Sequence, residues 1–560
     1  MKKGYRVLLA LLLVFSVMLA ACSKTGEETQ PQPTDKGREQ NDSTKAESAK
    51  VSAKGEFPIV PQKATLNVMI QQDSAVLDYI NNEFTKFLEE KTNVQINWTL
   101  VPHTDWNTRL NLLFASGSDL PDIIMGGVNN DLVSKYGPQG VFQPLNELIN
   151  KHSVEFVQVI DKVEGAKKMI TAPDGNIYGL PKIVECYNCT MARKMWVNQV
   201  FLDNLGLAVP TTTDEFYNML KMFKEQDPNK NGKADEIPLI GSVTGWNQNV
   251  DMFIMSAFVL NPGGNRFILK EDTITSAYTT SEWREGLSYM KNLADEKLLD
   301  PVSFTQKQEQ VKQLVEGGEV PIVGAIPSGG PHVFANVNGE RFKDFVAIPP
   351  LKGPSGVQQS IWDPYGYVQA SHMMILTNAC QDECADIAVK WADQFYNEEV
   401  TARSRLGVPE VDWEKAPDGS IGVNGKPAAY KAILQWGSDQ KSHWNFTNPG
   451  YWPREWTEGT VYDPSNPWEL QYLLTKATID HYEPFKQRVV PPLSLETSEA
   501  EEFAQLGSII NPYVEESIAR FILGGLDLEK DWDGYLKELD KMGITRYLEI
   551  AQSAYDRQWK

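Results

Sequence analysis

The chain has 560 residues, of which 41% are hydrophobic, and a formal net charge of −21 at pH 7. A chain of this length folds into two or more domains. Because nucleic-acid binding needs clusters of Lys and Arg that neutralise phosphates, we expect no nucleic-acid partner for this acidic chain.

The first 22 residues have the pattern of an export signal. Lys2, Lys3 and Arg6 precede an apolar run over residues 7–21, which is too short to span a membrane comfortably and ends at small residues. Residues 19–22, Leu-Ala-Ala-Cys, resemble the lipobox of bacterial lipoproteins, whose Cys carries acyl chains such as palmitate. The resemblance implies a signal peptide over residues 1–21 and a lipidated Cys22 held by the lipid bilayer. The alternative is an ordinary signal peptide in which Cys22 is incidental.

A polar segment follows the signal. Residues 23–56 contain six Lys or Arg, seven Asp or Glu and almost no large apolar side chains, so they bury too little surface to fold. We expect residues 22–56 to be a disordered tether and residues 57–560 to be the folded body. The signal carries +3 and the tether −1, which leaves −23 on the body. Such a body favours a neutral or cationic ligand over a polyanion, unless a local basic pocket overrides the average.

Strands and helices alternate at the start of the body. Apolar patterns predict strands at residues 65–70, 94–98 and 120–125, with helices near residues 80–88 and 110–114 between them. This order indicates parallel β-α-β units in an α/β sheet. Since ligands of such sheets bind beyond the carboxyl ends of the strands, loops 71–74 and 126–130 form a candidate site. Residues 197–319 and 499–560 have mostly helical patterns, and the second of these regions is interrupted at Gly524.

Four Cys residues remain in the body, as the pairs Cys186 with Cys189 and Cys380 with Cys384. In an exported protein they favour disulfides, with three possible connectivities, and pairing within each pair is preferred over pairing between them. A zinc site using all four, a redox site at the first pair and free thiols remain alternatives.

Several motifs together resemble family 1 extracellular solute-binding proteins. Residues 112–123, LLFASGSDLPDI, match a segment typical of that family, as do residues 196–212. Residues 531–533, 543–544 and 552–557 resemble the terminal signature of its large lipoprotein branch, which includes alginate-oligosaccharide-binding proteins. The similarity extends over nearly the whole body, and the order of the motifs is more specific than any one of them.

The resemblance implies a periplasmic-binding-protein-like fold, in which crossing segments join two α/β lobes around a hinged inter-lobe cleft. It implies a protein at the outer face of the cell membrane that captures an oligosaccharide and delivers it to the permease subunits of an ABC importer. We expect this protein to be a monomer without catalytic residues.

Residues 227–236, DPNKNGKADE, predict a calcium loop. Side-chain oxygens fall at loop positions 1, 3, 5 and 9, and Gly at position 6 allows the sharp turn, which is the spacing that calcium needs. Position 12 is Pro238, so the loop departs from an EF-hand. It resembles the calcium loop of alginate-oligosaccharide-binding proteins, in which acidic residues at positions 9 and 10 complete the shell. The ligands would be Asp227, Asn229, Asn231, Lys233 (through its carbonyl), Asp235 and Glu236. The alternative is an ordinary polar turn.

The candidate residues of a sugar cleft are aromatic, amide and carboxylate side chains in predicted loops. Sugars present flat apolar faces edged by hydroxyl groups, so aromatic rings would stack on them while amides and carboxylates bind the hydroxyls. Any single Trp is more often a core residue than a cleft residue. The predicted set is Gln72, Asp73, Trp106, Asn129, Asn130, Tyr187, Trp246, Asn247, Trp362, Asp363 and Tyr365.

Two other functions are compatible with the composition. A surface glycoside hydrolase needs two carboxylates that flank the scissile bond, and the chain has 74 Asp and Glu residues. However, it contains no G-x-S-x-G or H-E-x-x-H motif, and its six His residues are scattered, so we expect no enzyme. The binding fold would also suit a sensor or a receptor for a peptide or another small solute.

Overall fold

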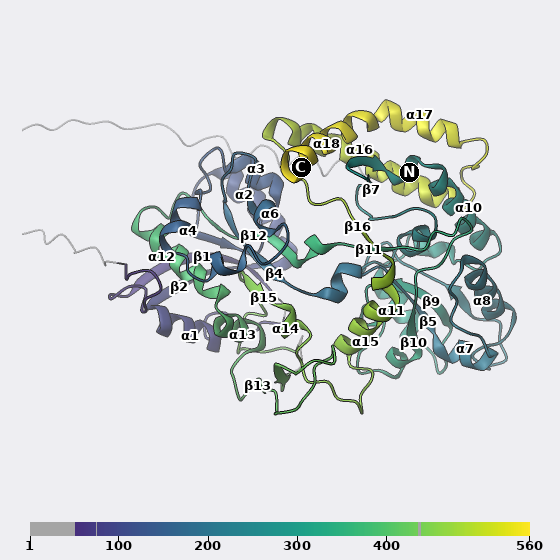
Figure 1. The fold of residues 1–560 in the computed structure, drawn as a ribbon, viewed down its shortest axis with the longest axis horizontal. Coiled ribbons are helices and arrows are strands. Elements are labelled where there is room, and N and C mark those ends of the chain that lie inside the picture. Colours follow the sequence, from purple (N-terminus) through teal and green to yellow (C-terminus); the bar gives the residue numbers. More distant parts are fainter. Residues whose placement is uncertain (1–50, 74, 435–437) are drawn as a thin grey trace, which may run out of the picture. The chain divides into compact units, whose positions relative to one another are not determined.

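Two sheets organise the part of the chain that the computed structural model describes, residues 51–73, 75–434 and 438–560. The six-stranded sheet has the order β15-β4-β12-β3-β1-β2, and the four-stranded sheet has the order β10-β5-β9-β6. We call the regions built around them the first lobe and the second lobe (Figure 1).

The first sheet is almost entirely parallel. Its strands are β1 (Ala64–Gln72), β2 (Val94–Pro102), β3 (Ile123–Met125), β4 (Gly179–Val184), β12 (Val368–Leu376) and β15 (Gly450–Trp452). Only β12 runs against its neighbours β3 and β4, whereas β2 and β3 are parallel to β1, and β15 is parallel to β4. The carboxyl ends of β1, β2, β3, β4 and β15 therefore lie at one edge of the sheet, as the β-α-β pattern predicts.

Side chains from both faces of the first sheet are buried. Leu66, Val68 and Ile70 of β1 belong to one core cluster, and Met69 belongs to another. A strand covered on both faces is typical of an α/β sheet with helices on each side. The helices of this lobe are α1 (Glu83–Thr92), α2 (Trp106–Ser116), α3 (Asn130–Tyr136), α4 (Asn146–His152), α5 (Phe156–Val159), α6 (Ala166–Ile170), α12 (Glu383–Asp393), α13 (Glu398–Leu406) and α14 (Arg454–Thr457).

The second lobe is richer in helix, in agreement with its sequence pattern. Its sheet contains β5 (Lys194–Asn198), β6 (Ile237–Leu239), β9 (Val323–Ser328) and β10 (Phe345–Ile348). Its helices are α7 (Gln199–Leu205), α8 (Thr213–Glu225), α9 (Val250–Ile254), α10 (Ser281–Asp295), α11 (Gln308–Glu316), α15 (Leu470–Ala477), α16 (Thr497–Ile522), α17 (Trp532–Met542) and α18 (Ile544–Trp559). Local sequence fixes helix starts: Thr212 and Glu215 form a reciprocal capping box at α8.

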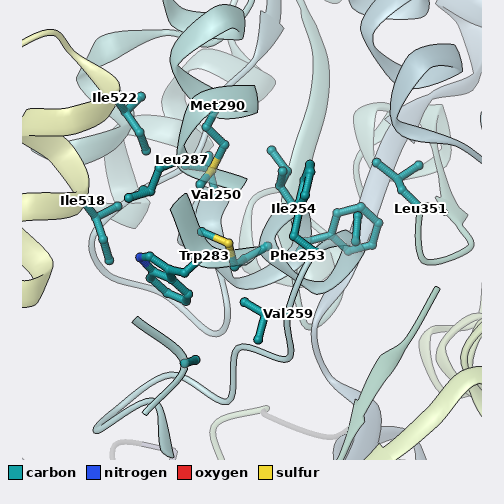
Figure 2. Packing of buried hydrophobic residues seen from close by; sticks show 14 of the residues in the cluster. Val250, Phe253, Ile254, Val259, Trp283, Leu287, Met290, Leu351, Ile518 and Ile522 are labelled. Carbon is teal, nitrogen blue, oxygen red and sulfur yellow. The ribbon is translucent and has the colours of Figure 1, made fainter. Parts of the chain in front are cut away.

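The core of the second lobe joins segments far apart in the sequence. Ile518 and Ile522 of α16 point toward Trp283 and Leu287 of α10 (Figure 2), and all four belong to the same buried cluster. The C-terminal helices therefore complete the core of this lobe. Their predicted interruption at Gly524 has a positive φ of 80°.

Three segments connect the lobes, between β4 and β5, between β10 and β12, and between β15 and α15. The short strand β11 (Ser360–Trp362) lies in the second connection and pairs in parallel with β16 (Lys486–Arg488), which lies between α15 and α16. The backbone N–H of Asp363 donates to the carbonyl of Thr190 (2.8 Å), which joins the first two connections. Two further ribbons, β7 (Phe267–Lys270) with β8 (Thr273–Ser276) and β13 (Trp413–Lys415) with β14 (Tyr430–Ala432), lie outside the main sheets.

The folded body begins before residue 57. Lys390 Nζ donates to the carbonyls of Ser52 and Ala53, both at 2.8 Å, and Ser52 Oγ donates to the carbonyl of Pro58. The predicted end of the tether at residue 56 is therefore wrong by a few residues, because these carbonyls bind a lysine of α12. Cys22 and the signal segment lie outside the described residues. Within the described ranges, no helix combines the length and hydropathy needed to cross a membrane.

Candidate functional site

The loops after β1 and β3 lie at the same edge of the first sheet. Ile70 of β1 is in register with Met125 of β3 in the parallel pair, so β3 ends opposite Ile70 and β1 continues to Gln72 at the same edge of the sheet. Gln72 and Asp73 are partly exposed at the end of β1, and Asn129 and Asn130 are exposed after β3. The structure therefore places these four predicted residues in neighbouring strand-end loops, where an α/β sheet binds ligands.

Asp73 and Asn129 are already oriented by hydrogen bonds. One carboxylate oxygen of Asp73 accepts from the N–H of Ala75 (2.9 Å), and the other accepts from the side-chain amide of Asn445 (3.0 Å). Asn129 caps α3 by accepting from the N–H of Leu132 (2.9 Å). Carboxylate oxygens have about four acceptor sites, so Asp73 keeps capacity to accept from a ligand hydroxyl.

Trp246 forms an exposed aromatic surface in the second lobe. It follows β6, which is parallel to β9, and it packs against Gly329 at the end of β9. The N–H of Gly329 donates to the carbonyl of Trp246 (2.9 Å), and the side chain of Trp246 remains 36% exposed. Asn247 is partly exposed beside it and has a positive φ of 59°. A fixed, exposed indole next to an amide is the combination that stacks on a sugar and binds its hydroxyls.

Gly329 determines how the indole lies. A Cβ atom on Gly329 would be 2.2 Å from Cε3 of Trp246, so an Ala there forces the ring away from the strand end. We expect Gly329→Ala to weaken oligosaccharide binding about tenfold while lowering the melting temperature little, because the displaced ring is exposed rather than buried. Titration calorimetry together with Trp fluorescence would check this. Unchanged affinity and an unchanged emission spectrum would contradict it.

Trp106 is a core residue, and its assignment to the cleft is wrong. The side chain is 3% exposed, belongs to the core cluster on one face of the first sheet, and donates from Nε1 to the carbonyl of Gly127 (2.9 Å). Its ring also lies against Gly126, where a Cβ atom would be 2.9 Å from Cζ2. The ring packs against the loop after β3 and has no face that a ligand could contact.

The remaining predicted residues lie in the connections between the lobes. Tyr187 is 6% exposed, and the guanidinium of Arg454 lies 3.9 Å from its ring centroid; burial raises the pKa of Tyr187. Trp362 is partly buried, with Lys486 Nζ 4.8 Å and Arg488 Cζ 5.1 Å from its ring centroid. Tyr187 and Trp362 thus already stack against cations of this chain, which makes them poorer sugar platforms than Trp246.

Asp363 and Tyr365 also have internal roles. Asp363 accepts from the N–H groups of Tyr365 (3.0 Å) and Gly366 (3.1 Å), and burial raises its pKa. Tyr365 is 4% exposed and makes an edge contact with Trp559, with ring centroids 4.9 Å apart. It lines a cavity of about 780 Å³ that contains neither Trp246 nor the strand-end loops. Because Tyr365 is buried, its assignment to the cleft is wrong. Asp363 is partly exposed, and its place in the cleft stays a prediction.

The four Cys residues of the body form two local disulfides, Cys186 with Cys189 and Cys380 with Cys384. The first lies in the connection between β4 and β5, and the second lies just before and within α12. Because their thiols are consumed, neither a four-Cys zinc site nor a free-thiol site is compatible with this structure.

The loop over residues 227–236 has converging oxygens. The carboxylate of Asp227 accepts from the N–H groups of Asn231 (3.0 Å) and Gly232 (2.8 Å), and Gly232 has a φ of 75°. The side-chain amides of Asn229 and Asn231 both reach the carboxylate of Asp235, at 3.3 and 3.1 Å. Four of the predicted ligands, at loop positions 1, 3, 5 and 9, thus take part in the hydrogen bonds that hold this loop together.

One carboxylate oxygen of Glu236 lacks a hydrogen-bond partner. Its Oε1 is buried, and no donor among the described residues binds it. Burial raises the pKa of Glu236, and the neighbouring charges of Asp227 and Asp235 raise it further. A buried carboxylate beside two others is costly unless a cation compensates it. The residues present thus fit a hard divalent cation, and the donor set of carboxylates and amides is the one calcium prefers.

Sequence reasoning missed the residues that position Trp246. Gly329 follows β9 directly, and two consecutive glycines after an apolar strand are a sign of close backbone approach. His332 lies with its ring centroid 5.9 Å from that of Trp246, and burial lowers its pKa, so it is neutral at pH 7. Nothing in its sequence surroundings distinguishes His332 from the other scattered histidines.

A family model described as bacterial extracellular solute-binding protein matches residues 70–402. The chain belongs to this family. The matched range includes both strand-end loops of the first lobe, the Trp246 loop and the 227–236 loop of this solute-binding protein. The predicted fold class is thereby confirmed, since the structures it is similar to are two-lobed solute-binding proteins.

The solute-binding protein is similar over most of its length to characterised transport proteins. It is 26% identical over 490 residues to the fructooligosaccharide ABC transporter substrate-binding protein FusA of Streptococcus pneumoniae, covering 84% of this chain and 86% of FusA. A structure of a FusA EF-hand mutant in complex with fructo-nystose has a TM-score of 0.70, with 23% identity, and covers 88% of this chain and 99% of FusA.

Two further relatives bear on the metal and the anchor. The alginate-binding protein AlgQ2, in a structure without calcium ion, has a TM-score of 0.63 and 22% identity, and covers 89% of this chain and 98% of AlgQ2. Lipoprotein LipO of Bacillus subtilis is 26% identical over 282 residues, which is 48% of this chain and 52% of LipO.

Proposed function

We propose that this solute-binding protein captures an oligosaccharide outside the cell and delivers it to the permease subunits of an ABC importer. The observation that carries the proposal is the Trp246 indole, exposed and fixed on Gly329 at the strand ends of the second lobe. In the first lobe, Asp73 and Asn129 offer hydrogen-bonding groups at the equivalent strand ends. The names of FusA and its sugar-bound structure support an oligosaccharide as the cargo.

The proposed action is binding and release without bond cleavage. The indole would stack on a sugar ring, while amides and carboxylates from the strand-end loops would accept and donate to its hydroxyls. The three connections between the lobes would allow the two groups to approach around the ligand. This role requires no catalytic residue, and the name of FusA describes a substrate-binding protein of an ABC transporter.

Transport is tested by uptake in the native host. A strain lacking this protein is expected to lose uptake of a labelled oligosaccharide, and uptake should return with the wild-type gene. Complementation with Trp246→Ala should restore uptake only at higher oligosaccharide concentration. Full uptake in the deletion strain for every oligosaccharide that the purified protein binds would contradict the transport role.

Calcium is proposed as a structural ion of the second lobe. Asp227, Asn229, Asn231, Asp235 and Glu236 would supply side-chain oxygens, and Lys233 its carbonyl. The ion would supply positive charge that compensates the three carboxylates, and it would tie the end of α8 to the start of β6. The EF-hand variant of FusA and the calcium-free structure of AlgQ2 support a calcium site in relatives.

The anchor is proposed from the sequence. Cys22 would carry the lipid, and the polar tether would hold the body near the outer face of the cell membrane. Cys22→Ser is expected to move the protein from the membrane fraction to the culture medium, because a polar tether alone has no affinity for the bilayer. Fractionation followed by immunoblotting measures this. A Cys22→Ser protein that stays in the membrane fraction would disprove the anchor.

A further inference from the structure

Two cations near the carboxyl edge of the first sheet lack counter-ions. Lys182 lies near the end of β4, and Arg405 lies in the last turn of α13. Lys182 Nζ is 5.0 Å and Arg405 Cζ is 5.7 Å from the ring centroid of Phe446. Among the described residues, no carboxylate lies within ion-pair distance of either side chain, and neither donates a hydrogen bond to a protein atom.

The pair of cations is held in place by apolar contacts. Phe446 is fully buried, and Arg405 also lies 5.0 Å from the ring centroid of Trp452. Both residues are partly exposed. Positive charges held on aromatic rings rather than on carboxylates keep their hydrogen-bond donors available for another acceptor.

A strained turn brings these groups to the strand-end loop. Asn445 and Phe446 have φ angles of 50° and 56°, a region that non-glycine residues avoid. The turn aims the amide of Asn445 at Asp73 (3.0 Å) and the ring of Phe446 at the two cations. Backbone strain of this kind is concentrated at ligand-binding sites, where the surrounding structure maintains it.

The charge of this subsite is positive at neutral pH. Burial lowers the pKa of Lys182 to about 8, and Arg405 lowers it while Asp73 raises it. Burial lowers the pKa of His443 to about 4, so this neighbour of the pair is neutral. Asp73 and Asp412 are the carboxylates that act on the cluster, and each already accepts hydrogen bonds from its own loop. A body with a net charge of −23 thus has a local cluster of positive charge near the carboxyl edge of the first sheet.

We propose that Lys182 and Arg405 bind a carboxylate of the ligand, so that the cargo is an acidic oligosaccharide containing a uronic acid. The inference rests on the proposed function, which it makes more specific. A carboxylate between a lysine and an arginine forms charge-assisted hydrogen bonds, about twice as strong as neutral ones. The overall negative charge of the body repels a long polyanion. We therefore expect short acidic saccharides to bind better than acidic polymers. Trp246 would stack on a sugar ring at the opposite lobe.

The test uses matched acidic and neutral ligands. Titration calorimetry on the purified soluble protein would compare trisaccharides of galacturonate, mannuronate, guluronate and glucuronate with their methyl esters, which remove the charge and keep the stereochemistry. Sulfated trisaccharides and neutral fructo-oligosaccharides complete the panel. The variants are Lys182→Met and Arg405→Met, with Lys86→Met on the exposed face of α1 as a control for charge.

The tightest ligand is expected to be a uronate that binds about tenfold or more better than its methyl ester. Lys182→Met and Arg405→Met should remove this preference, whereas Lys86→Met should keep it. Thermal unfolding and binding of the methyl ester verify that each variant is folded. A neutral or sulfated saccharide as the tightest ligand would overturn the inference and leave the proposed function standing. Absence of binding to every saccharide would overturn both.

Discussion

Trp246→Ala is expected to weaken oligosaccharide binding by roughly ten- to a hundredfold, with little loss of stability. The indole provides an exposed apolar surface at the strand ends, and covering it with a sugar ring is worth on the order of 1.5–3 kcal/mol. It is 36% exposed and lies outside the buried clusters of the second lobe, so its removal leaves no core cavity. Titration calorimetry measures the affinity, and thermal unfolding measures the stability.

Trp468→Ala is the matched control for this substitution. Trp468 is a partly buried indole of the same lobe that packs on the core beside α15, away from the Trp246 loop. It should cost stability and leave the affinity close to that of the wild type. Equal losses of affinity in the two variants would mean that a general loss of folding, rather than stacking on Trp246, explains the effect.

The second large effect is expected from the 227–236 loop. In wild-type protein, calcium at a hundredfold excess over its dissociation constant should stabilise the folded state by about 2.7 kcal/mol and raise the melting temperature. Replacing Asp227 and Asp235 together by Ala should abolish this rise, because two of the three carboxylates at the site are lost. Glu236 then remains as a single buried carboxylate. Scanning calorimetry with added calcium, and with chelator, measures both states.

A control with the same chemistry is available on the surface. Asp418 and Asp463 are exposed turn residues outside the 227–236 loop, and replacing both by Ala should leave the calcium response intact. If calcium still raised the melting temperature of the Asp227 and Asp235 double variant by the wild-type amount, the ion would have to bind elsewhere.

The strand-end loops of the first lobe were predictable because their positions follow from hydrophobic periodicity. The apolar residues of β1 and β3 predict parallel strands, and the polar residues directly after them therefore lie at the ligand-binding edge. The 227–236 loop was predictable because its spacing of polar residues is local in sequence, within about twelve consecutive residues.

The errors concern residues whose surroundings come from distant segments. Trp106 looks like a loop aromatic, but its indole is buried against the turn at Gly126. Tyr365 is covered by Trp559, which is nearly two hundred residues away in sequence. Lys182 and Arg405 are likewise brought together only by tertiary packing on Phe446. A sequence pattern predicts whether a segment is a helix or a strand from the period of its apolar residues. It does not show which distant side chain covers that segment in the folded protein.

Equilibrium binding combined with product analysis tests most directly whether this protein captures an oligosaccharide and leaves it intact. The purified body should be titrated with the acidic and neutral saccharides, and each mixture then analysed by mass spectrometry after long incubation. We predict saturable one-to-one binding of at least one saccharide, weaker binding of that saccharide by Trp246→Ala, and recovery of the ligand uncleaved. Release of shorter saccharides, or binding that does not depend on Trp246, would contradict it.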